Sequence, residues 1–232
     1  MSVRIYAHRG ASAERPENTM AAFRRAVELG VDALELDIHA TADGVLVVSH
    51  DGDGRRRAGV DRRIGDLTWA EASRWDVGAG ERMPTFEEVV TAFPTVRLNV
   101  DLKHGAAEAA IALLRRFDAE ERTCLASFQM RTMERVRALG YRGPTALSRA
   151  EALAALGLPA TVRRGRFRCR AQRAQLPVWL ARPWIIARMK ALGLDVDFWT
   201  VDDPALAQRL VAMGADGIMT NDPARIVPAL GR

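Results

Sequence analysis

Cysteine is scarce in this chain of 232 residues, which contains only Cys124 and Cys169. Two distant cysteines without metal-ligand spacing exclude a disulfide framework and a paired-cysteine zinc site. No run reaches the roughly 18 to 20 apolar residues that a membrane-spanning helix needs. The opening residues MSVRIYAHRG also lack the apolar stretch of a signal peptide. We therefore expect a cytoplasmic protein whose two thiols are reduced.

Neither sign of charge dominates, because 34 Lys and Arg oppose 29 Asp and Glu and leave a net charge of +5. The small basic excess fits anionic partners such as phosphoesters, lipid headgroups or nucleic acid. The stretch RRGRFRCRAQR at 163–173 is interpreted as a solvated face rather than a lipid or nucleic-acid contact. No nucleic-acid-binding motif is present, so we expect no nucleic-acid partner. Weak association with a membrane surface stays open.

Strand-like and helix-like segments alternate along the chain. VRIYAH at 3–8 precedes ENTMAAFRRAVELG, in which Met20, Phe23 and Val27 recur at helical spacing. DALELDIHA and VLVVSHD flank an Asp43-Gly44 turn and predict a hairpin. Further strands are expected at 96–103, 123–128, 143–148, 174–178, 196–201 and 216–220, and helices at 67–75, 85–93, 106–117, 129–139, 149–156, 183–192, 204–213 and 223–230.

With the hairpin counted once, eight strand and helix units remain, and this number is typical of an α/β (β/α)8 TIM barrel. We predict a single domain over residues 1–232, with a small insertion after the second barrel strand at approximately 44–90. An open doubly wound sheet is the competing fold. It is disfavoured because no G-x-G-x-x-G motif follows the first strand.

Acidic side chains gather where the early strands end, which is where barrel enzymes place their chemistry. Glu35 and Asp37 share one face of their strand because side chains alternate, and Asp101 shares a face with Lys103. Three carboxylates from adjacent strands form an all-oxygen set suited to a divalent cation, Mg²⁺ or Ca²⁺. The structural alternative is an ion pair of Glu35 or Asp101 with Arg9 or Lys103.

The cationic and titratable groups near these acids indicate phosphoester chemistry. Arg9 and Lys103 are suited to bind the oxygens of a phosphate. His8 and His50 are the natural proton donor and acceptor at neutral pH. Together these groups predict hydrolysis of a phosphodiester by charge neutralisation and acid-base catalysis. The remaining histidines are interpreted as core or surface residues, with an outer role left open for the first: His39 and His104.

The motifs HRG, PENT, ELD, SHD and NVDLK, followed by FWTVDD and GADGIMTNDP, resemble in this order those of the glycerophosphodiester phosphodiesterase family. The resemblance spans essentially residues 5–224. It implies a barrel with a small insertion, and hydrolysis of a small glycerophosphodiester to an alcohol and sn-glycerol 3-phosphate. The implied roles are catalysis by His8 and His50, phosphate contacts by Arg9 and Lys103, metal binding by Glu35, Asp37 and Asp101, support by Glu17, Asn18 and Asp51, and packing of substrate carbons by Trp199 and Phe128.

By analogy with the family, His50 is expected to act as the base and His8 as the acid. The chain departs from the family pattern in two places. Asp101 stands where the family usually has Glu, and the usual RTT after His50-Asp51 is replaced within GDGRRRAGVDRRIG. The first departure bears on metal preference, and the second on which alcohol group fits.

Two other functions stay open at this point. A lysophospholipase D-like phosphodiesterase acting on lipids would need a wide apolar mouth, and a non-catalytic phosphate or lipid-headgroup binder would keep only the barrel. The histidine pair argues against the binder, because binding requires no proton transfer. Which headgroup is preferred, which of Mg²⁺ and Ca²⁺ is used, and the oligomeric state do not follow from the sequence.

Overall fold

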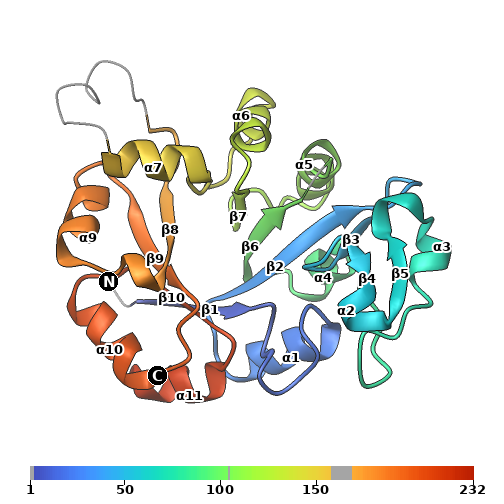
Figure 1. The fold of residues 1–232 in the computed structure, drawn as a ribbon, viewed down its shortest axis with the longest axis horizontal. Coiled ribbons are helices and arrows are strands. Elements are labelled where there is room, and N and C mark those ends of the chain that lie inside the picture. The colour runs from blue at the N-terminus through green and yellow to red at the C-terminus, as the bar shows by residue number, and fades with distance from the viewer. Residues whose placement is uncertain (1–2, 104, 158–168) are drawn as a thin grey trace.

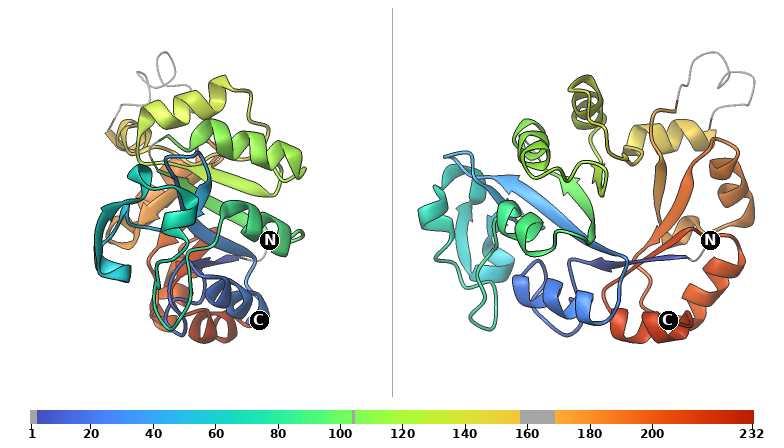
Figure 2. Two further views of the ribbon diagram at one scale, coloured as in Figure 1. Left: turned by 90° about the vertical axis from the view of Figure 1, so that its right-hand side faces the viewer. Right: turned by 180° about the vertical axis from the view of Figure 1, so that it is seen from behind.

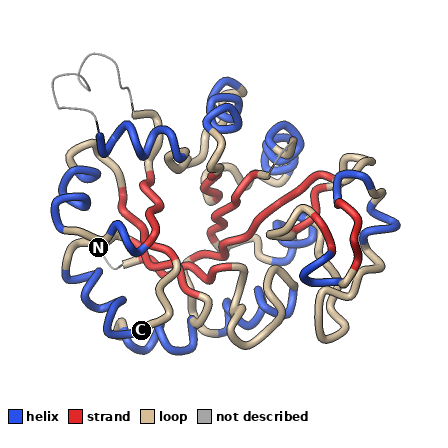
Figure 3. Tube along the Cα trace, in the orientation of Figure 1, coloured by secondary structure: helices blue, strands red, loops and turns tan. Residues whose placement is uncertain are grey.

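A curled parallel sheet forms the centre of the computed structural model, which describes residues 3–103, 105–157 and 169–232. The strands follow the order β7-β6-β2-β1-β10-β9-β8, and helices cover the outer side of the sheet (Figures 1 and 3). The fold is therefore α/β and TIM-barrel-like, as predicted. The strands are β1 Arg4–His8, β2 Ala33–Ala40, β6 Arg97–Leu102, β7 Thr123–Ala126, β8 Arg173–Pro177, β9 Asp195–Trp199 and β10 Gly217–Thr220.

A short irregular segment joins the two edge strands β7 and β8. Thr145 forms a parallel bridge to Leu125, and Ala146 forms one to Arg173. The prediction of a regular strand at 143–148 is wrong. Pro144 has no backbone N–H to donate to a neighbouring strand, although its carbonyl accepts from Leu125 N at 3.0 Å. The two bridges nevertheless place this segment between β7 and β8.

Several helices begin at residues whose side chains satisfy free backbone N–H groups. The Thr19 hydroxyl accepts from Ala22 N at 3.2 Å, and Asp203 accepts from Ala205 N at 3.0 Å. α9, α10 and α11 each begin with proline, which suits the first helical turn. The helices agree with the predicted ranges within a few residues: α1 Met20–Glu28, α5 Ala107–Arg116, α6 Met130–Ala138, α7 Arg149–Gly157, α9 Pro183–Lys190, α10 Pro204–Ala212 and α11 Pro223–Ala229.

The chain between β2 and β6 packs to one side of the sheet (Figures 1 and 2). β3, Leu46–Val48, pairs antiparallel with β2 and is shorter than predicted. The segment has its own apolar cluster, consisting of Val47, Ile64, Leu67, Ala72, Val77 and Met83. Its other elements are β4 Asp53–Gly54, α2 Arg55–Ala58, β5 Val60–Arg63, η1 Ile64–Asp66, α3 Trp69–Ala72 and α4 Phe86–Ala92.

β2 separates an apolar layer from a polar interior. Leu34, Leu36 and Ile38 are fully buried in the main apolar cluster, together with Phe23 of α1. The alternate side chains are the acids of the ELD motif, so the predicted two-faced strand is confirmed. In the ranges that the structure describes, no helix combines the length and apolar character needed to cross a membrane. Two predictions, His104 and residues 163–168 of the arginine cluster, lie outside the described residues.

Candidate active site

A cavity of about 330 Å³ lies at the carboxyl ends of the strands. Its predicted lining residues are His8, Arg9, Glu35, Asp37, His50, Asp101, Lys103, Phe128 and Trp199. Further lining residues, which the prediction left outside the site, are Asn99, Ala126, Ser127, Ala146, Leu147, Gln175 and Met219. The charged groups come from β1, β2, the chain after β3 and the end of β6, whereas the later strand ends supply mainly apolar groups.

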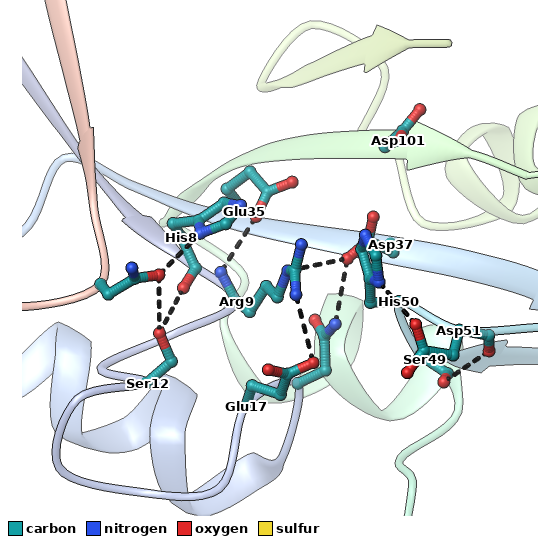
Figure 4. A network of polar contacts seen from close by, with 12 residues as sticks. His8, Arg9, Ser12, Glu17, Glu35, Asp37, Ser49, His50, Asp51 and Asp101 are labelled. Atoms are coloured by element: carbon teal, nitrogen blue, oxygen red, sulfur yellow. Dashed lines mark hydrogen bonds and ion pairs between the residues drawn. The ribbon is translucent and has the colours of Figure 1, made fainter. Parts of the chain in front are cut away.

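The three predicted acidic residues converge from two neighbouring strands (Figure 4). Asp37 and Asp101 are partners in the parallel register of β2 and β6, and Glu35 precedes Asp37 on the same face. All three are buried. Burial, followed by the charges of Asp37 and Asp101, holds the pKa of Glu35 well above its usual range. Burial also raises the pKa of Asp101.

Lys103 lies between two of these acids. Its Nζ is 2.7 Å from Asp37 Oδ1 and 2.6 Å from Asp101 Oδ2. Burial opposes ionisation of Asp37, but Lys103 outweighs it and lowers the pKa of that carboxyl. Arg9 adds a longer contact, with Nε 3.6 Å from Asp37 Oδ2. The expected ion pair of Asp101 with Lys103 is therefore present in this structure, and Asp37 shares the same lysine.

The donor chemistry at this position fits a hard divalent cation. Glu35 is a buried carboxyl whose ionisation is disfavoured by two neighbouring carboxylates, and a cation would relieve that repulsion. Asn18 donates from Nδ2 to Asp37 Oδ2 at 3.1 Å, while its buried Oδ1 has no hydrogen-bond partner. Within the described part of the chain, however, no three acidic, histidine or cysteine side chains form a ready ligand group. The three carboxylates are therefore of the right chemical type for a divalent cation, but the Lys103 ammonium lies between Asp37 and Asp101.

His8 is held by a chain of hydrogen bonds from the loops that follow β9 and β10. Asn221 donates from Nδ2 to Asp202 Oδ2 at 2.8 Å, which leaves its Oδ1 as the acceptor for His8 Nδ1 at 2.7 Å. His8 Nε2 lies 3.9 Å from Glu35 Oε2. Burial lowers the pKa of His8 and favours the neutral ring. This geometry orients Nε2, but gives no support to His8 as the acid in the absence of a bound anion.

His50 is oriented by the residue that follows it. Its Nδ1 is 2.8 Å from Asp51 Oδ1. Burial opposes ionisation of Asp51, but hydrogen bonds with His50 and Arg56 outweigh it and lower the pKa of Asp51. Because an ionised carboxylate can only accept, His50 donates from Nδ1, and Nε2 of the neutral ring is left to accept a proton. His39 contacts the backbone oxygen of His50 at 3.3 Å and does not line the cavity.

The loop after β1 explains why the HRG and PENT motifs have their sequence. Arg9 adopts a left-handed conformation with φ 59°, and its backbone N donates to Glu35 Oε2 at 2.9 Å. Gly10 follows with φ 82°, and a Cβ there would lie 2.7 Å from Ala22. The Arg9 guanidinium contacts Glu17 Oε1 at 3.3 Å. Backbone conformation and Glu17 together direct Arg9 into the cavity.

Phe128 and Trp199 form an edge-to-face pair with ring centroids 6.0 Å apart. Their contact lies on the apolar side of the cavity, and Phe128 is 59% exposed. A pair of this kind favours contact with the carbon atoms of a ligand. The position fits the packing role that the resemblance implies for both residues.

Several residues with a part in this geometry were not predicted. Asn221 and Asp202 stand at strand ends, but their link to His8 depends on β10 pairing with β1, which the sequence pattern does not specify. The Ser12 hydroxyl donates to the backbone oxygen of His8 at 2.9 Å and also lies 3.1 Å from Asn221 Oδ1. Arg56 contacts both Glu17 and Asp51. The signal for Arg56 was hidden in an arginine-rich stretch that is typical of a solvated surface.

Comparison with known proteins gives the same family along nearly the whole chain. Residues 8–225 match the glycerophosphoryl diester phosphodiesterase family. The probable glycerophosphodiester phosphodiesterase 2 of Mycobacterium tuberculosis is 33% identical, over 93% of this chain and 86% of the relative. The glycerophosphodiester phosphodiesterase of Caldanaerobacter subterraneus is 32% identical over 98% of this chain and 97% of its own. The lysophospholipase D GDPD1 of Homo sapiens is 29% identical over 94% of this chain and 83% of the relative.

Solved structures show a similar fold. A glycerophosphoryl diester phosphodiesterase from Silicibacter pomeroyi superposes with a TM-score of 0.83 at 26% identity, covering 99% of this chain and 93% of that one. A phosphodiesterase from Oleispira antarctica, solved with its product sn-glycerol-3-phosphate, gives a TM-score of 0.86 at 24% identity, covering 99% and 97%. From the match over residues 8–225 and the extended identity to the relatives, the chain belongs to the glycerophosphoryl diester phosphodiesterase family and is an enzyme of that class.

Proposed function

We propose that this enzyme hydrolyses small glycerophosphodiesters to an alcohol and sn-glycerol 3-phosphate, with a divalent cation, Mg²⁺ or Ca²⁺, and a pair of histidines. The observation that carries the proposal is a shared cavity: the two histidines, Arg9, Lys103 and the three carboxylates all line it. The product complex of the Oleispira antarctica phosphodiesterase supports the product assignment.

The two histidines transfer protons in opposite directions, each at Nε2. His50 accepts a proton at Nε2 from the attacking hydroxyl, because Asp51 accepts from its Nδ1. His8 donates from Nε2 to the leaving alkoxide once it is protonated. A phosphate anion bound beside His8 favours that protonation, since an opposite charge stabilises the imidazolium and offsets burial. Each positioned proton transfer contributes about 10²- to 10⁴-fold.

The cationic side chains and the acids bind and neutralise the phosphodiester. Arg9 presents a guanidinium that can contact two phosphate oxygens, and Lys103 provides a second positive charge at the cavity. Glu35, Asp37 and Asp101 would hold the cation, and Asn18 would orient Asp37 by its hydrogen bond. A divalent cation bound there supplies Lewis-acid stabilisation of phosphoryl oxygens and lowers the pKa of a bound hydroxyl.

A second candidate is lysophospholipase D activity on lipid substrates. Large apolar side chains are exposed after the later strands, with Trp179 70% and Trp184 59% exposed in addition to Phe128. Both tryptophans follow the carboxyl end of β8, the same end at which the cavity opens. An exposed aromatic rim favours substrates with an acyl chain. The human relative named lysophospholipase D supports this alternative.

The segment 44–90 is proposed to be an insertion after the second barrel strand of a single domain. Support comes from its separate apolar cluster around Val47 and Ile64. The non-catalytic binder is disfavoured, because His8 and His50 both line the cavity with an orienting partner on Nδ1.

The decisive experiment is a panel of diesters assayed with and without EDTA. Glycerophosphocholine, glycerophosphoethanolamine, glycerophosphoglycerol and lysophosphatidylcholine are incubated with enzyme in Mg²⁺ or Ca²⁺, and released glycerol 3-phosphate or lysophosphatidate is measured. We expect cation-dependent turnover of the water-soluble diesters that EDTA abolishes. Higher kcat/KM for lysophosphatidylcholine would favour the lipid alternative, and turnover that persists in EDTA would contradict the cation requirement.

Variants of the histidines test the proton transfers in the same assay. His8→Gln and His50→Gln are each expected to lower kcat by about 10²- to 10⁴-fold. His39→Gln is the matched control, because the His39 ring does not line the cavity and its hydrogen bond is to the backbone oxygen of His50. Circular dichroism of all three variants checks the fold. Wild-type kcat in folded His8→Gln and His50→Gln would refute the assignment.

A further inference from the structure

We propose that Arg56 is a positioning residue that holds His50 and Arg9 in place through two shared carboxylates, Asp51 and Glu17. The inference rests on the proposed function and adds a residue that touches neither the cavity nor a substrate. Arg56 lies in α2, on the segment that packs beside the sheet (Figure 1). It joins two loops that carry separate parts of the catalytic machinery.

The Arg56 guanidinium uses all three nitrogens. Nε lies 2.6 Å from Asp51 Oδ2, Nη2 lies 2.6 Å from Glu17 Oε1, and Nη1 lies 3.2 Å from Glu17 Oε2. The two contacts to Glu17 form a fork, which fixes the direction of the carboxylate as well as its distance. A lysine could supply one such contact but cannot form the fork. The geometry therefore requires the arginine itself.

Each of the two carboxylates that bind Arg56 also binds a residue of the candidate active site. Asp51 Oδ1 accepts a hydrogen bond from His50 Nδ1 at 2.8 Å, as Figure 4 shows. Its other oxygen, Oδ2, accepts from Arg56. Glu17 receives Arg9 Nη1 on Oε1 at 3.3 Å. Without Arg56, the Asp51 carboxylate would keep its contact with His50 but lose the contact that holds its other oxygen. The orientation of the His50 ring and of the Arg9 guanidinium would loosen together.

The backbone that carries Arg56 is anchored on both sides. Gly54 lies so close to Val60 and Trp75 that a Cβ would approach to 2.8 Å and 2.9 Å. Arg57 donates to the backbone oxygen of Val77. The position of Gly78 connects this region to the loop after β1, because a Cβ there would lie 3.6 Å from Pro16. Arg56 thus extends from a fixed frame.

A neighbouring arginine gives a matched control. Arg55 is also in α2, and its side chain is 67% exposed against 49% for Arg56. Arg55 pairs with Asp53 at 2.7 Å and Asp61 at 3.5 Å, both in its own hairpin. Exposed ion pairs contribute little to stability, so a purely structural role predicts small and similar effects for both arginines. A positioning role predicts a kinetic effect for Arg56 alone.

The experiment compares Arg56→Gln, Arg56→Lys and Arg55→Gln in full-length enzyme with glycerophosphocholine and saturating cation. We expect Arg56→Gln to lower kcat/KM by about 10- to 100-fold, with part of the loss restored in Arg56→Lys. Arg55→Gln is expected to remain within about twofold of wild type, as for other exposed ion pairs. Thermal unfolding of the three variants should agree within a few degrees, so that the kinetic loss is not a loss of fold.

A double-mutant cycle with Asp51→Asn tests the route. Because Arg56 acts in part through Asp51, the kinetic losses of Arg56→Gln and Asp51→Asn should be strongly non-additive. Full additivity would exclude the route through Asp51. Equal activity of Arg56→Gln and Arg55→Gln in an active enzyme would overturn the proposal while leaving the proposed function intact.

A spectroscopic readout separates this proposal from the proposed function. In ¹⁵N-labelled protein, the ring nitrogens of His50 report its tautomer, which the structure assigns as protonated on Nδ1. We expect the His50 signals to shift or broaden in Arg56→Gln and not in Arg55→Gln. This result is expected whether or not glycerophosphocholine is hydrolysed. Unchanged His50 signals in Arg56→Gln would refute the positioning role.

Discussion

Asn221, which directly follows β10, accepts a hydrogen bond from Nδ1 of His8 on β1, across 2.7 Å. The two residues lie at opposite ends of the chain and meet because their strands pair in parallel, with Ala7 opposite Thr220. The amide is itself fixed by Asp202, which accepts from Nδ2 at 2.8 Å and from the backbone N at 2.7 Å. The tautomer of a proposed catalytic histidine is thus set by the residue that follows the last strand.

Replacing Asn221 tests that dependence. Asn221→Leu removes the acceptor, and we expect kcat to fall by about 10- to 100-fold, as for other groups that orient a site residue. Ser12→Ala is the control, because it removes only a hydroxyl that contacts Asn221 and the His8 backbone. Steady-state kinetics with glycerophosphocholine check the result. Equal losses in both variants would show that the amide has no special role.

Cation binding should stabilise the fold, since a cation would relieve the repulsion among buried carboxylates. At about 100 times Kd the gain is about 2.7 kcal/mol, and each kcal/mol corresponds to roughly 2 to 4 °C in a protein of this size. Asp101→Asn should abolish the increase in melting temperature caused by Mg²⁺ or Ca²⁺. Asp61→Asn, at an exposed carboxylate, should retain it. An undiminished increase in Asp101→Asn would place the cation elsewhere.

Acid should weaken the contact between α6 and α7. Glu151 binds Arg137 at 2.5 Å and accepts from Ser148 N at 2.8 Å. Burial opposes its ionisation, but Arg137 outweighs it and lowers the pKa of Glu151 below the ordinary 4.5. The folded pKa lies below the unfolded one. The stabilisation is therefore fully present above pH 4.5 and is lost as the pH falls through the folded value.

Urea unfolding of Glu151→Gln measures this linkage. The variant should be less stable than wild type at neutral pH by about 1 to 3 kcal/mol, and the difference should shrink as the pH falls below 4.5. Glu134→Gln, at an exposed glutamate of α6, should follow the wild-type pH dependence. A difference that stays constant across this range would contradict the assigned pKa direction.

Gly217 is required by close packing at the opposite end of the barrel. A Cβ there would lie 2.3 Å from Asp197 Oδ1 and 2.6 Å from the Tyr6 ring, and both neighbours are buried. We expect Gly217→Ala to destabilise the protein by about 1 to 3 kcal/mol. Gly157→Ala, where a Cβ would meet no atom of the described residues within 4 Å, should instead stabilise it by about 0.4 to 1 kcal/mol. Thermal unfolding distinguishes the two, and a stabilised Gly217→Ala would contradict the packing argument.

Much of the fold and the site could be predicted because strand alternation is written in the sequence. The alternation of Leu34, Leu36 and Ile38 with Glu35 and Asp37 specifies which side chains enter the interior. The number of strand and helix units indicates a barrel, and in a barrel the carboxyl ends of the strands, where these acids lie, meet at one end. The failure at 143–148 has a local cause, since a proline within a short apolar run removes a donor from the ladder.

Other features depend on tertiary contacts that no local pattern contains. The position of Lys103 between Asp37 and Asp101 is a choice of side-chain conformation. The fork of Arg56 depends on how the chain after β3 folds back onto the loop after β1. In the sequence, Arg56 is the middle one of three consecutive arginines, and no local pattern indicates which of them is exposed to solvent.

The division of the cavity between early and later strands has an evolutionary consequence. His8, Glu35, His50 and Lys103 arise in the first half of the chain, whereas Phe128 and Trp199 arise in the second. Exchange of the later strand ends can therefore alter the apolar side of the cavity while the proposed proton-transferring side chains stay the same, provided that Asn221 and Asp202, which orient His8, are retained.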